Sequence, residues 1–429
     1  MALTILCIAF FGLLILGVLV AFAFGFSALA TLLYEGLPMA VIVQPMTSGM
    51  NVFSFLAIPF FIFAGELMMY GGIADKIVDF AKALVGQVRA SLSMSNVVAC
   101  TLFGGVSGSP VADVSAMGAV MIPMMKKEGY DADYVVNVTT HAALVGALMP
   151  TSHNMIIDPL AAGGKVSIAM LIAAGLMPAL LLTVCNLAAA YLVAVKRGYP
   201  SGTFPGWAIV ARSLAAALPG LFVVVLILGG TLSGIFTATE SAAVAVLYAL
   251  FLCTVVYRTL KRERFLKAAA KAVKTTDVVL LLIGIAAAFG YIISLYEVPD
   301  LTGKFLSGLS SAPWVIFLYV TIILFILGTF LDMAATILIC TPIFLPIAMQ
   351  FGMSPVQFGI VMLINCALGL NTPPVGTTQF IGCAIGGVSV GQVMRSIWPF
   401  CGALLVCLML VTYVPAVSLW LPDIFNAPK

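Results

Sequence analysis

Charged side chains are scarce in this sequence. Asp, Glu, Lys and Arg make up 8% of the 429 residues, and 63% are hydrophobic, whereas soluble domains carry about 25% charged residues. A surface of this composition cannot face water, which excludes a soluble globular domain. A helix needs about 20 apolar residues to cross the hydrocarbon core of a bilayer, and we find about eleven or twelve such segments. We expect the first of them, within residues Ala2 to Leu33, to be one retained helix.

The sequence also lacks the motifs on which common enzymes depend. It contains no G-x-x-x-x-G-K-S/T phosphate loop, which argues against coupling to ATP within this chain. The nine cysteines are scattered without a C-x-x-C pair, and no Cys/His cluster suits a metal ion. Ser109 has no base that the sequence places nearby, and Gly108-Ser109-Pro110 is not a nucleophile elbow. We therefore expect a protein that is not an enzyme and has no cofactor.

The basic residues are concentrated on one predicted side of the membrane. Seven of them fall between Arg258 and Lys274, where their spacing predicts an interfacial helix on anionic lipid headgroups; nucleic-acid binding is the less favoured alternative. Cytoplasmic loops collect Lys and Arg. If the N-terminus is cytoplasmic, only Lys165, Lys304 and Lys429 lie on the periplasmic side. We expect a multi-pass protein of the bacterial inner membrane in this orientation.

The chain contains an internal repeat. At an offset of 223 residues, five Gly or Pro positions of the first half match the second half without a gap. The matched pairs are Gly105 and Gly328, Pro123 and Pro346, Gly129 and Gly352, Gly146 and Gly369, and Pro150 and Pro373. The predicted division is a first repeat at 1–205, a connecting transmembrane helix at 206–235, and a second repeat at 236–429. Because five crossings separate the two repeats, the second is expected to be inverted relative to the first.

Each repeat is predicted to contain two interrupted elements. A helical hairpin, at about 90–125 and 313–348, is broken near its centre by small or polar residues, so its arms are expected to be too short to span the bilayer. Such a hairpin is re-entrant. A broken transmembrane helix follows each hairpin, at about 134–160 and 355–384. The predicted fold is therefore an all-α integral membrane protein of two inverted-topology repeats.

The interrupted segments suit small ions. Backbone carbonyls freed by a helix break, together with Ser and Thr hydroxyls, are hard neutral ligands for Na⁺. We predict one Na⁺ site where the first hairpin tip meets the first break, and a second at the matching place in the other half. The predicted ligands are Ser107, Gly108, Ser109, Thr151 and Ser152 for the first site, and Gly328, Asp332, Asn371, Thr372 and Gly376 for the second.

The same segments are candidates for binding an organic anion, because half-helix N-termini attract carboxylates through free amides and the helix dipole. The candidate substrate-binding residues are Ser109, Pro110, Asp113, His153, Asn154, Pro373 and Thr377. For Asp113 and Asp332, which follow the hairpin tips, capping of a helix N-terminus is as good an explanation as ligand binding. No arginine lies within the predicted hairpins or broken helices to mark a carboxylate clamp, so the sequence does not specify which acid is bound.

Four motifs resemble one family, the large membrane subunit of tripartite ATP-independent periplasmic (TRAP) transporters, and the likeness covers essentially the whole chain. The motifs are Ile58-Pro59-Phe60-Phe61 with Gly65-Glu66-Leu67, Ser107-Gly108-Ser109-Pro110-Val111-Ala112-Asp113, Thr237-Ala238-Thr239-Glu240-Ser241-Ala242-Ala243, and Thr372-Pro373-Pro374-Val375-Gly376. The chain departs from the family pattern at Pro110, where a small residue is typical, and at Met149-Pro150-Thr151-Ser152, where Ile-Pro-Pro-Ser is common.

The resemblance implies a small membrane subunit and a periplasmic substrate-binding protein as partners, import of an organic acid such as a dicarboxylate or sialic acid, and coupling to Na⁺. It also implies a scaffold and a transport domain that moves as an elevator. The main alternative is a stand-alone sodium-coupled organic anion transporter. An ion channel and a membrane-embedded hydrolase are less favoured, because the sequence has inverted hairpins rather than a ring of pore segments, and no catalytic dyad.

Overall fold

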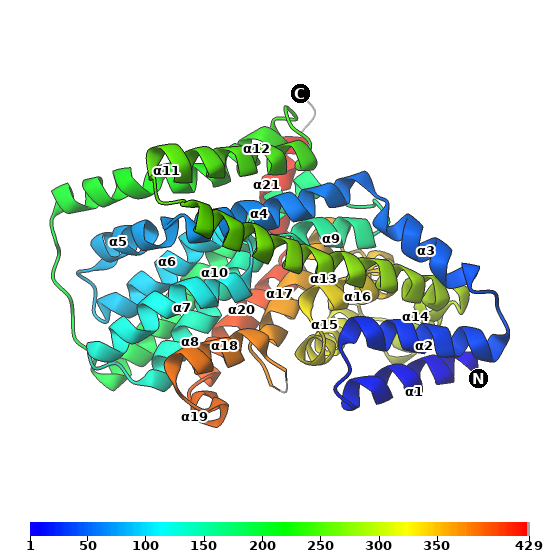
Figure 1. Ribbon diagram of the computed structural model, residues 1–429. Helices are drawn as coiled ribbons and strands as arrows, with labels where there is room; N and C mark the ends of the chain where they lie inside the picture. Colours follow the sequence, from blue (N-terminus) through cyan, green and yellow to red (C-terminus); the bar gives the residue numbers. More distant parts are fainter. Residues whose placement is uncertain (374, 427–429) are drawn as a thin grey trace.

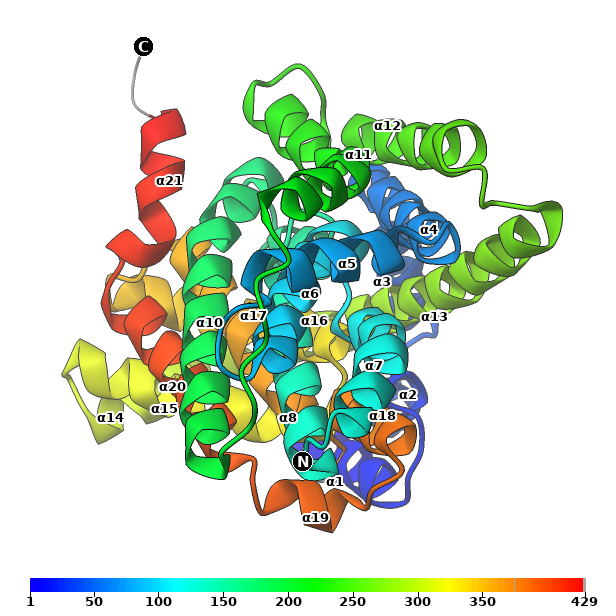
Figure 2. The ribbon, with the colours of Figure 1, turned by 90° about the vertical axis from the view of Figure 1, so that its left-hand side faces the viewer.

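A computed structural model describes residues 1–373 and 375–426, so Pro374 and Lys429 of the sequence analysis lie outside the described residues. The described part of the chain is helical, with a single isolated β-bridge between Arg89 and Ser201 and no strand. Figure 1 shows α1 and α2 as a pair beside the N-terminus, while α5 to α8 gather at the opposite end of the molecule. Turned by 90°, the molecule shows α14 and α21 at its margin (Figure 2).

The first half contains ten α-helices and two 3₁₀ turns. They are α1 (Ala2–Ile15), α2 (Val20–Glu35), α3 (Ala40–Met50), η1 (Phe53–Leu56), α4 (Ala57–Tyr70), α5 (Ile73–Val85), α6 (Ser91–Ser107), α7 (Pro110–Lys127), α8 (Ala132–Ala143), η2 (Leu144–Leu148), α9 (Asn154–Ala161) and α10 (Ile168–Arg197).

The rest of the chain continues with α11 (Trp207–Leu232), which occupies the predicted connecting segment. The second half contains α12 (Ala238–Phe251), the π-helical turn η3 (Leu252–Val256), α13 (Arg262–Leu295), α14 (Val298–Leu309), α15 (Pro313–Phe330), α16 (Met333–Gln350), α17 (Pro355–Leu370), α18 (Thr377–Gly386), α19 (Val390–Met394), α20 (Trp398–Tyr413) and α21 (Ala416–Asn426).

The helices confirm a multi-pass membrane protein. Among the described residues, seven helical segments are long and apolar enough to cross a bilayer, and the bent pair α20 and α21, with a 53° angle, makes an eighth. Four shorter apolar helices, α1, α2, α6 and α17, add to them. The exposed side chains of the long helices are largely hydrophobic, as for Leu192 on α10 and Leu247 on α12. Such a surface suits lipid.

The prediction of one helix within residues Ala2 to Leu33 is wrong. The segment forms two helices, α1 and α2, which pack against each other. Gly17 separates them, because it adopts the left-handed conformation at φ 78° while its amide donates to the carbonyl of Leu14. A glycine takes this conformation without the steric cost of a Cβ, which ends a helix that hydrophobicity alone would continue.

The predicted interfacial helix in the basic stretch is not an element of its own, and its contact with lipid headgroups stays a prediction. Most of its basic residues lie on the first turns of α13, whose 34 residues continue without a proline from Arg262 to Leu295. At 1.5 Å per residue this helix is about 50 Å long, which exceeds the ~30 Å hydrocarbon core. The face carrying Lys267 and Lys271 is exposed, and Ala268 and Ala272 are buried. The basic face is therefore an extension of a membrane-length helix.

The two predicted hairpins coincide with helix pairs. The first pair, α6 and α7, meets at residues 107–110, and the second, α15 and α16, meets at Leu331 and Asp332. Both arms of the second pair have 18 residues and are long enough to span, so the expectation that its arms are too short is wrong. Leu331 and Asp332 reverse the direction of the chain between α15 and α16, and both helices keep their 18 residues. The re-entrant course and the inverted relation of the two halves stay predictions.

The packing of the interrupted elements is reciprocal between the two halves. In the first half, α6 packs against α8 and η2; in the second, α15 packs against α17. The helix after each break packs on the hairpin of the other half, with α9 on α16 and α18 on α7. The matched glycines explain the close crossings. A Cβ on Gly146 would lie 3.4 Å from Cα of Gly104, and one on Gly369 would lie 2.3 Å from the carbonyl oxygen of Gly328.

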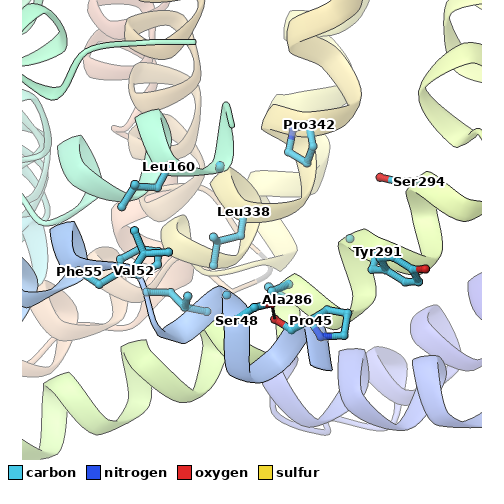
Figure 3. Close-up of a pocket in the computed structure, with 15 residues that line it drawn as sticks. Pro45, Ser48, Val52, Phe55, Leu160, Ala286, Tyr291, Ser294, Leu338 and Pro342 are labelled. Atoms are coloured by element: carbon cyan, nitrogen blue, oxygen red, sulfur yellow. Dashed lines mark hydrogen bonds between the residues drawn. The ribbon is translucent and has the colours of Figure 1, made fainter. Parts of the chain in front are cut away.

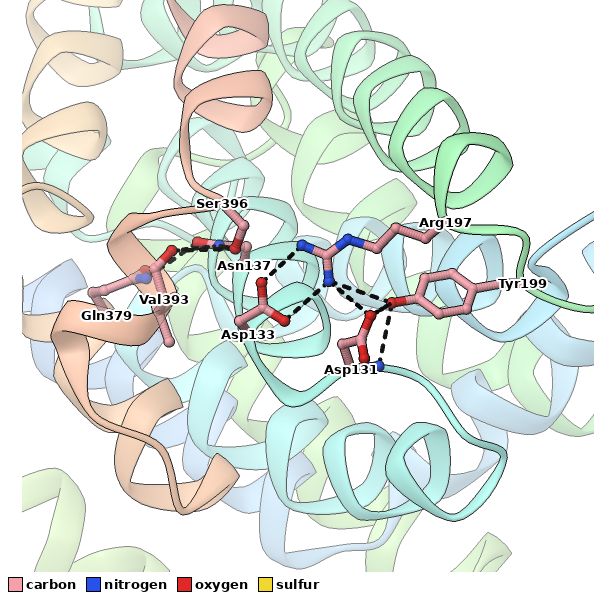
Figure 4. A network of polar contacts seen from close by, with 8 residues as sticks. All are labelled: Asp131, Asp133, Asn137, Arg197, Tyr199, Gln379, Val393 and Ser396. Atoms are coloured by element: carbon pink, nitrogen blue, oxygen red, sulfur yellow. Dashed lines mark hydrogen bonds and ion pairs between the residues drawn. The ribbon is translucent and has the colours of Figure 1, made fainter.

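A polar network at one end of the molecule joins the halves (Figure 4). Arg197 at the end of α10 pairs with Asp133 at 2.8 Å and with Asp131 at 2.9 Å. On the same helix α8, the Asn137 amide donates to Ser396 at 3.0 Å and accepts from the Gln379 amide of α18 at 3.2 Å. These contacts fix α8 between α10 of the first half and α18 of the second.

Candidate functional site

The first hairpin tip and the first helix break are in backbone contact. Helix α6 ends at Gly108, which adopts φ 65° and donates its amide to the carbonyl of Gly104 at 2.9 Å. A Cβ on Gly108 would lie 2.4 Å from the carbonyl carbon and oxygen of Thr151, so only glycine fits there. The Thr151 hydroxyl donates back to the carbonyl of Gly105 at 3.1 Å. The two segments predicted to form the first Na⁺ site therefore lie together.

Two local signals start α7 at this tip. The Ser109 hydroxyl accepts from the amide of Ala112 at 3.5 Å, and Pro110 occupies the first helical position, where a missing amide hydrogen costs nothing. Ser109 is half-buried and Pro110 is buried. The N-terminus of α7 thus faces the break that ends η2.

Asp113 is a fully buried carboxyl directly behind this tip. One oxygen, Oδ1, accepts a hydrogen bond from the hydroxyl of Ser107. The other, Oδ2, has no hydrogen-bond partner among the described residues. A Cβ on Gly146 would lie 2.5 Å from Oδ2, so the glycine crossing makes room for the carboxyl. Ser109 caps the helix, so Asp113 is not its capping residue.

Unpaired oxygens continue along the first break. The Ser152 hydroxyl is buried with no partner among the described residues, and so is Oδ1 of Asn154. The amide of Asn154 lies 3.3 Å from Sδ of Met333, at the start of α16. This contact brings the first break to the second hairpin tip. His153, which precedes α9, is half-buried.

The second tip and break form a similar arrangement. Asp332 is the N-cap of α16, because its carboxylate accepts from the amide of Ala334 at 3.2 Å. The carbonyl of Thr329 accepts from the amide of Val375 at 3.3 Å, which ties the end of α15 to the break between α17 and α18. A cavity of about 110 Å³ lies here, and Gly328, Asp332, Gly376 and Thr377 are among its lining residues.

The predicted ligands in the second break differ in how well they are paired. The Thr372 hydroxyl donates to the carbonyl of Leu368, in the last turn of α17, at 2.9 Å. Oδ1 of Asn371 accepts from the hydroxyl of Thr378, while its Nδ2 lacks a partner among the described residues. The Thr377 hydroxyl, which lines the cavity, is also without a partner in this part of the chain. Pro373 is exposed.

Sequence reasoning missed several buried polar residues near the breaks. Asn365 on α17 is completely buried, and neither its Oδ1 nor its Nδ2 has a partner among the described residues. Asp158 on α9 accepts a hydrogen bond from Thr341 of α16 at 2.9 Å. A carboxyl inside the apolar run Asn154 to Ala161 was the available signal for Asp158, while its partner lies 183 residues away in sequence.

The arrangement suits cations without forming a transition-metal site. Among the described residues no group of three His, Cys, Asp or Glu side chains could hold a metal ion. Carbonyls, hydroxyls and one carboxylate are instead the oxygen ligands that hard cations accept. The unpaired oxygens of Asp113, Ser152 and Asn154 fit this chemistry. Helices α7 and α16 begin at the hairpin tips, and α9 and α18 begin at the breaks; free amides at such N-termini favour an anion.

Comparison with known proteins gives consistent relatives over the whole chain. Residues 7–417 match the family described as tripartite ATP-independent periplasmic transporter, DctM component. The C4-dicarboxylate TRAP transporter large permease protein DctM of Pseudomonas aeruginosa is 39% identical, over 86% of each chain. The sialic acid TRAP transporter large permease protein SiaM of Vibrio cholerae is 35% identical, over 96% of this chain and 97% of its own.

A solved structure shares the fold. The YdaH transporter of Alcanivorax borkumensis superposes with a TM-score of 0.63 over 89% of this chain and 88% of its own, at 13% sequence identity. The family match over nearly all residues and the two relatives above 30% identity agree with the motifs at the hairpin tips and breaks. This chain belongs to the DctM component family, the large permease subunits of tripartite ATP-independent periplasmic transporters.

Proposed function

We propose that this chain imports an organic acid across the bacterial inner membrane in symport with Na⁺, and that a periplasmic binding protein delivers the acid. A small membrane subunit completes the permease. The N-terminus is cytoplasmic in this proposal. The observation that carries it is the contact between the first hairpin tip and the first break, where Gly108 lies against Thr151 and several buried oxygens stay unpaired.

The unpaired oxygens support Na⁺ as the coupling ion. A buried polar atom without a partner is costly, and a hard cation offsets that cost at Asp113, Ser152 and Asn154. In the second half, Asp332 and Thr377 line the small cavity and supply the corresponding oxygens. Na⁺ accepts neutral oxygen ligands, so hydroxyls and carbonyls suffice around a single carboxylate.

Four helix N-termini support a carboxylate as the substrate. Each contributes free backbone amides and a partial positive charge of about half an elementary charge. The relatives are named for C4-dicarboxylates and for sialic acid, and both substrates carry a carboxylate. We therefore assign the substrate class as organic acids. Reciprocal packing of α9 on α16 and α18 on α7 supports a single moving body that contains both breaks, as an elevator mechanism requires.

Sodium-driven uptake into proteoliposomes tests the tripartite assembly. The chain is reconstituted alone, with the small subunit, and with both partners, at equal protein and equal radiolabelled acid. We expect uptake only with both partners, because a mobile transport domain needs a broad scaffold and dilute acid needs capture. Full uptake by the chain alone would favour the stand-alone sodium-coupled transporter instead.

Removing single hydroxyls tests the Na⁺ sites. We expect Ser109→Ala and Thr372→Ala to shift the sodium concentration for half-maximal uptake while leaving thermal stability within about 1 kcal/mol of wild type, the usual effect of one lost cap or hydrogen bond. Ser115→Ala is the matched control, because this exposed serine on α7 donates only to its own helix, at 2.8 Å from the carbonyl of Val111. An unchanged sodium response in both test variants would assign the hydroxyls to packing.

A further inference from the structure

Asp158 is a buried carboxyl to which the transport proposal gives no role. It lies on α9, after the first break, and is 1% exposed. Its Oδ1 accepts from the hydroxyl of Thr341 on α16 at 2.9 Å. The other oxygen faces α17, where a Cβ placed on Gly359 would lie 2.4 Å from Oδ2. One carboxyl therefore joins an element of the first half to two elements of the second.

Asp158 has no cationic partner among the residues that the structure describes. The ion pairs among the described residues involve only Arg197 and Lys267, and neither pairs with this carboxyl. Helix α17 packs closely on Oδ2, since a Cβ on Gly359 would lie 2.4 Å from that oxygen, and the close packing favours the smallest cation. A bare carboxylate in a low-dielectric interior is strongly unfavourable. A proton is the cation small enough to neutralise the group where it lies.

The neighbouring titratable groups do not change this conclusion. Helix α16 contributes Cys340 and, at its N-cap, Asp332; α17 contributes Cys366; η1 and η2 contribute none. The titratable residues of α10 are Cys185, Tyr191, Lys196 and Arg197. The part of α10 that touches the Gly359 region is Leu171, and the first of those residues lies about 20 Å further along the helix at 1.5 Å per residue. Asp158 is therefore the carboxyl buried between α9, α16 and α17 in the described part of the chain.

A cavity of about 450 Å³ lies on the outer side of the same junction (Figure 3). Leu160 of α9 and Leu338 of α16 line one side of it, with Ser48 of α3 and Tyr291 of α13 among the residues around the rest. Two more lining residues are neighbours of the carboxyl and its partner: Ala161 lies one turn after Asp158, and Pro342 directly follows Thr341. The neighbours of Asp158 on α9 and of Thr341 on α16 thus form a wall of the open space, and Asp158 itself is not among its lining residues.

We propose that Asp158 is a proton-binding site that takes up and releases one proton in each transport cycle, through the cavity between α3, α9, α13 and α16. The proposal rests on the transport function proposed above. An O–H bond forms at the Asp158 carboxylate when a proton arrives from water, which yields the neutral acid. Movement of α9 and α16 relative to α3 and α13 opens the wall, the O–H bond breaks, and the proton returns to water on the other side.

Infrared spectroscopy of the purified full chain tests protonation without requiring uptake. We expect Asp158→Asn to lose a protonated-carboxyl band that is present in the wild type at neutral pH. Asp300→Asn, which removes an exposed carboxyl on α14, is the matched control and is expected to leave this band unchanged. Retention of the full band in Asp158→Asn would overturn the proposal.

Uptake by the complete tripartite assembly, measured against pH at a fixed sodium gradient, tests release. We expect the wild-type rate to change by about tenfold per pH unit on one limb, the limit for a single proton, and Asp158→Asn to lose that dependence. Thr341→Val keeps the carboxyl and its packing, so it serves if the asparagine variant does not fold; we expect it to move the midpoint of the profile. If Asp158→Asn loses the infrared band but keeps the wild-type pH profile, Asp158 is a permanently protonated structural group, and the proposed proton exchange is overturned. Absent uptake in the wild type would refute the proposed transport function alone.

Discussion

Gly108→Ala tests whether the contact between the first hairpin tip and the first break holds the site together. Gly108 has two constraints that most glycines of the chain do not combine. Its φ is 65°, and a Cβ would lie 2.4 Å from the carbonyl of Thr151 and 2.5 Å from the amide of Ser152. Both neighbours are backbone atoms, so they cannot move aside as the end of a flexible side chain would. An alanine must displace either α6 or the break.

The two constraints allow an estimate of how much Gly108→Ala destabilises the folded protein. A side chain in the left-handed conformation costs about 1–2 kcal/mol, and forcing a methyl group into a closely packed site costs a further ~1–3 kcal/mol. Gly129→Ala separates the two contributions. Gly129 has a similar φ of 83°, but nothing lies within 4 Å of its Cβ position. We therefore expect Gly108→Ala to destabilise the protein by about twice as much as Gly129→Ala.

Thermal unfolding in detergent, with and without Na⁺, measures both effects. We expect the larger loss of apparent Tm for Gly108→Ala, and we also expect Na⁺ to stabilise this variant less than it stabilises wild type or Gly129→Ala. A ligand that binds only the folded state raises its stability by RT ln(1 + [L]/Kd), so a disrupted site with a larger Kd gains less from the same Na⁺ concentration. Equal Tm losses in the two variants would refute the claimed contact, and an undiminished Na⁺ effect would remove the tip from the ion site.

Two further predictions concern orientation and pH. Cysteines that replace Lys126 and Lys304 are expected to react with impermeant reagents from opposite sides of the membrane, and labelling from the same side would refute the inverted repeat. Burial raises the pKa of Asp133, but hydrogen bonds from Arg197, Ser396 and the Tyr134 amide, together with the positive charge of Arg197, hold the pKa below its ordinary value. The pKa of Asp133 is lower in the folded state than in the unfolded state. The stability that its ion pair with Arg197 adds is therefore complete above the unfolded pKa of about 4 and is lost as pH falls through the folded-state pKa. We expect Asp133→Asn to flatten the decline of Tm below that pH, and an unchanged decline would assign the acid sensitivity elsewhere.

Local signals in the sequence predicted several boundaries well. Ser109 and Pro110 start α7 as N-cap and first helical residue, and Trp207 to Leu232 form one apolar helix in the predicted connecting segment. These signals act within a few residues, because capping and proline geometry depend on the chain next to them. The glycines of the repeat predicted equivalent positions, and Gly146 and Gly369 both lie at close helix crossings.

Other features depended on contacts that the sequence does not display. Hydrophobicity ran through Gly17, yet that residue separates α1 from α2 because the left-handed turn lets the two helices pack together. The basic stretch had the composition of an interfacial helix, but no proline or left-handed residue ends it after Arg262, so it continues into α13. The pairing of Asp158 with Thr341 follows only from the packing of α9 on α16.

That packing has a consequence for coupling between the two halves. Helix α9 begins at the first break but rests on the second hairpin, and α18 begins at the second break but rests on the first hairpin. A ligand that reorients the first break therefore shifts α9 against α16, where Asp158 meets Thr341 and Asn154 meets Met333. Because the core packs too densely to absorb such a shift locally, the displacement reaches the second tip at Asp332. We therefore expect binding at the two proposed sites to be linked through these side-chain contacts, and such a linkage would be reciprocal, since each site would change the affinity of the other by the same factor.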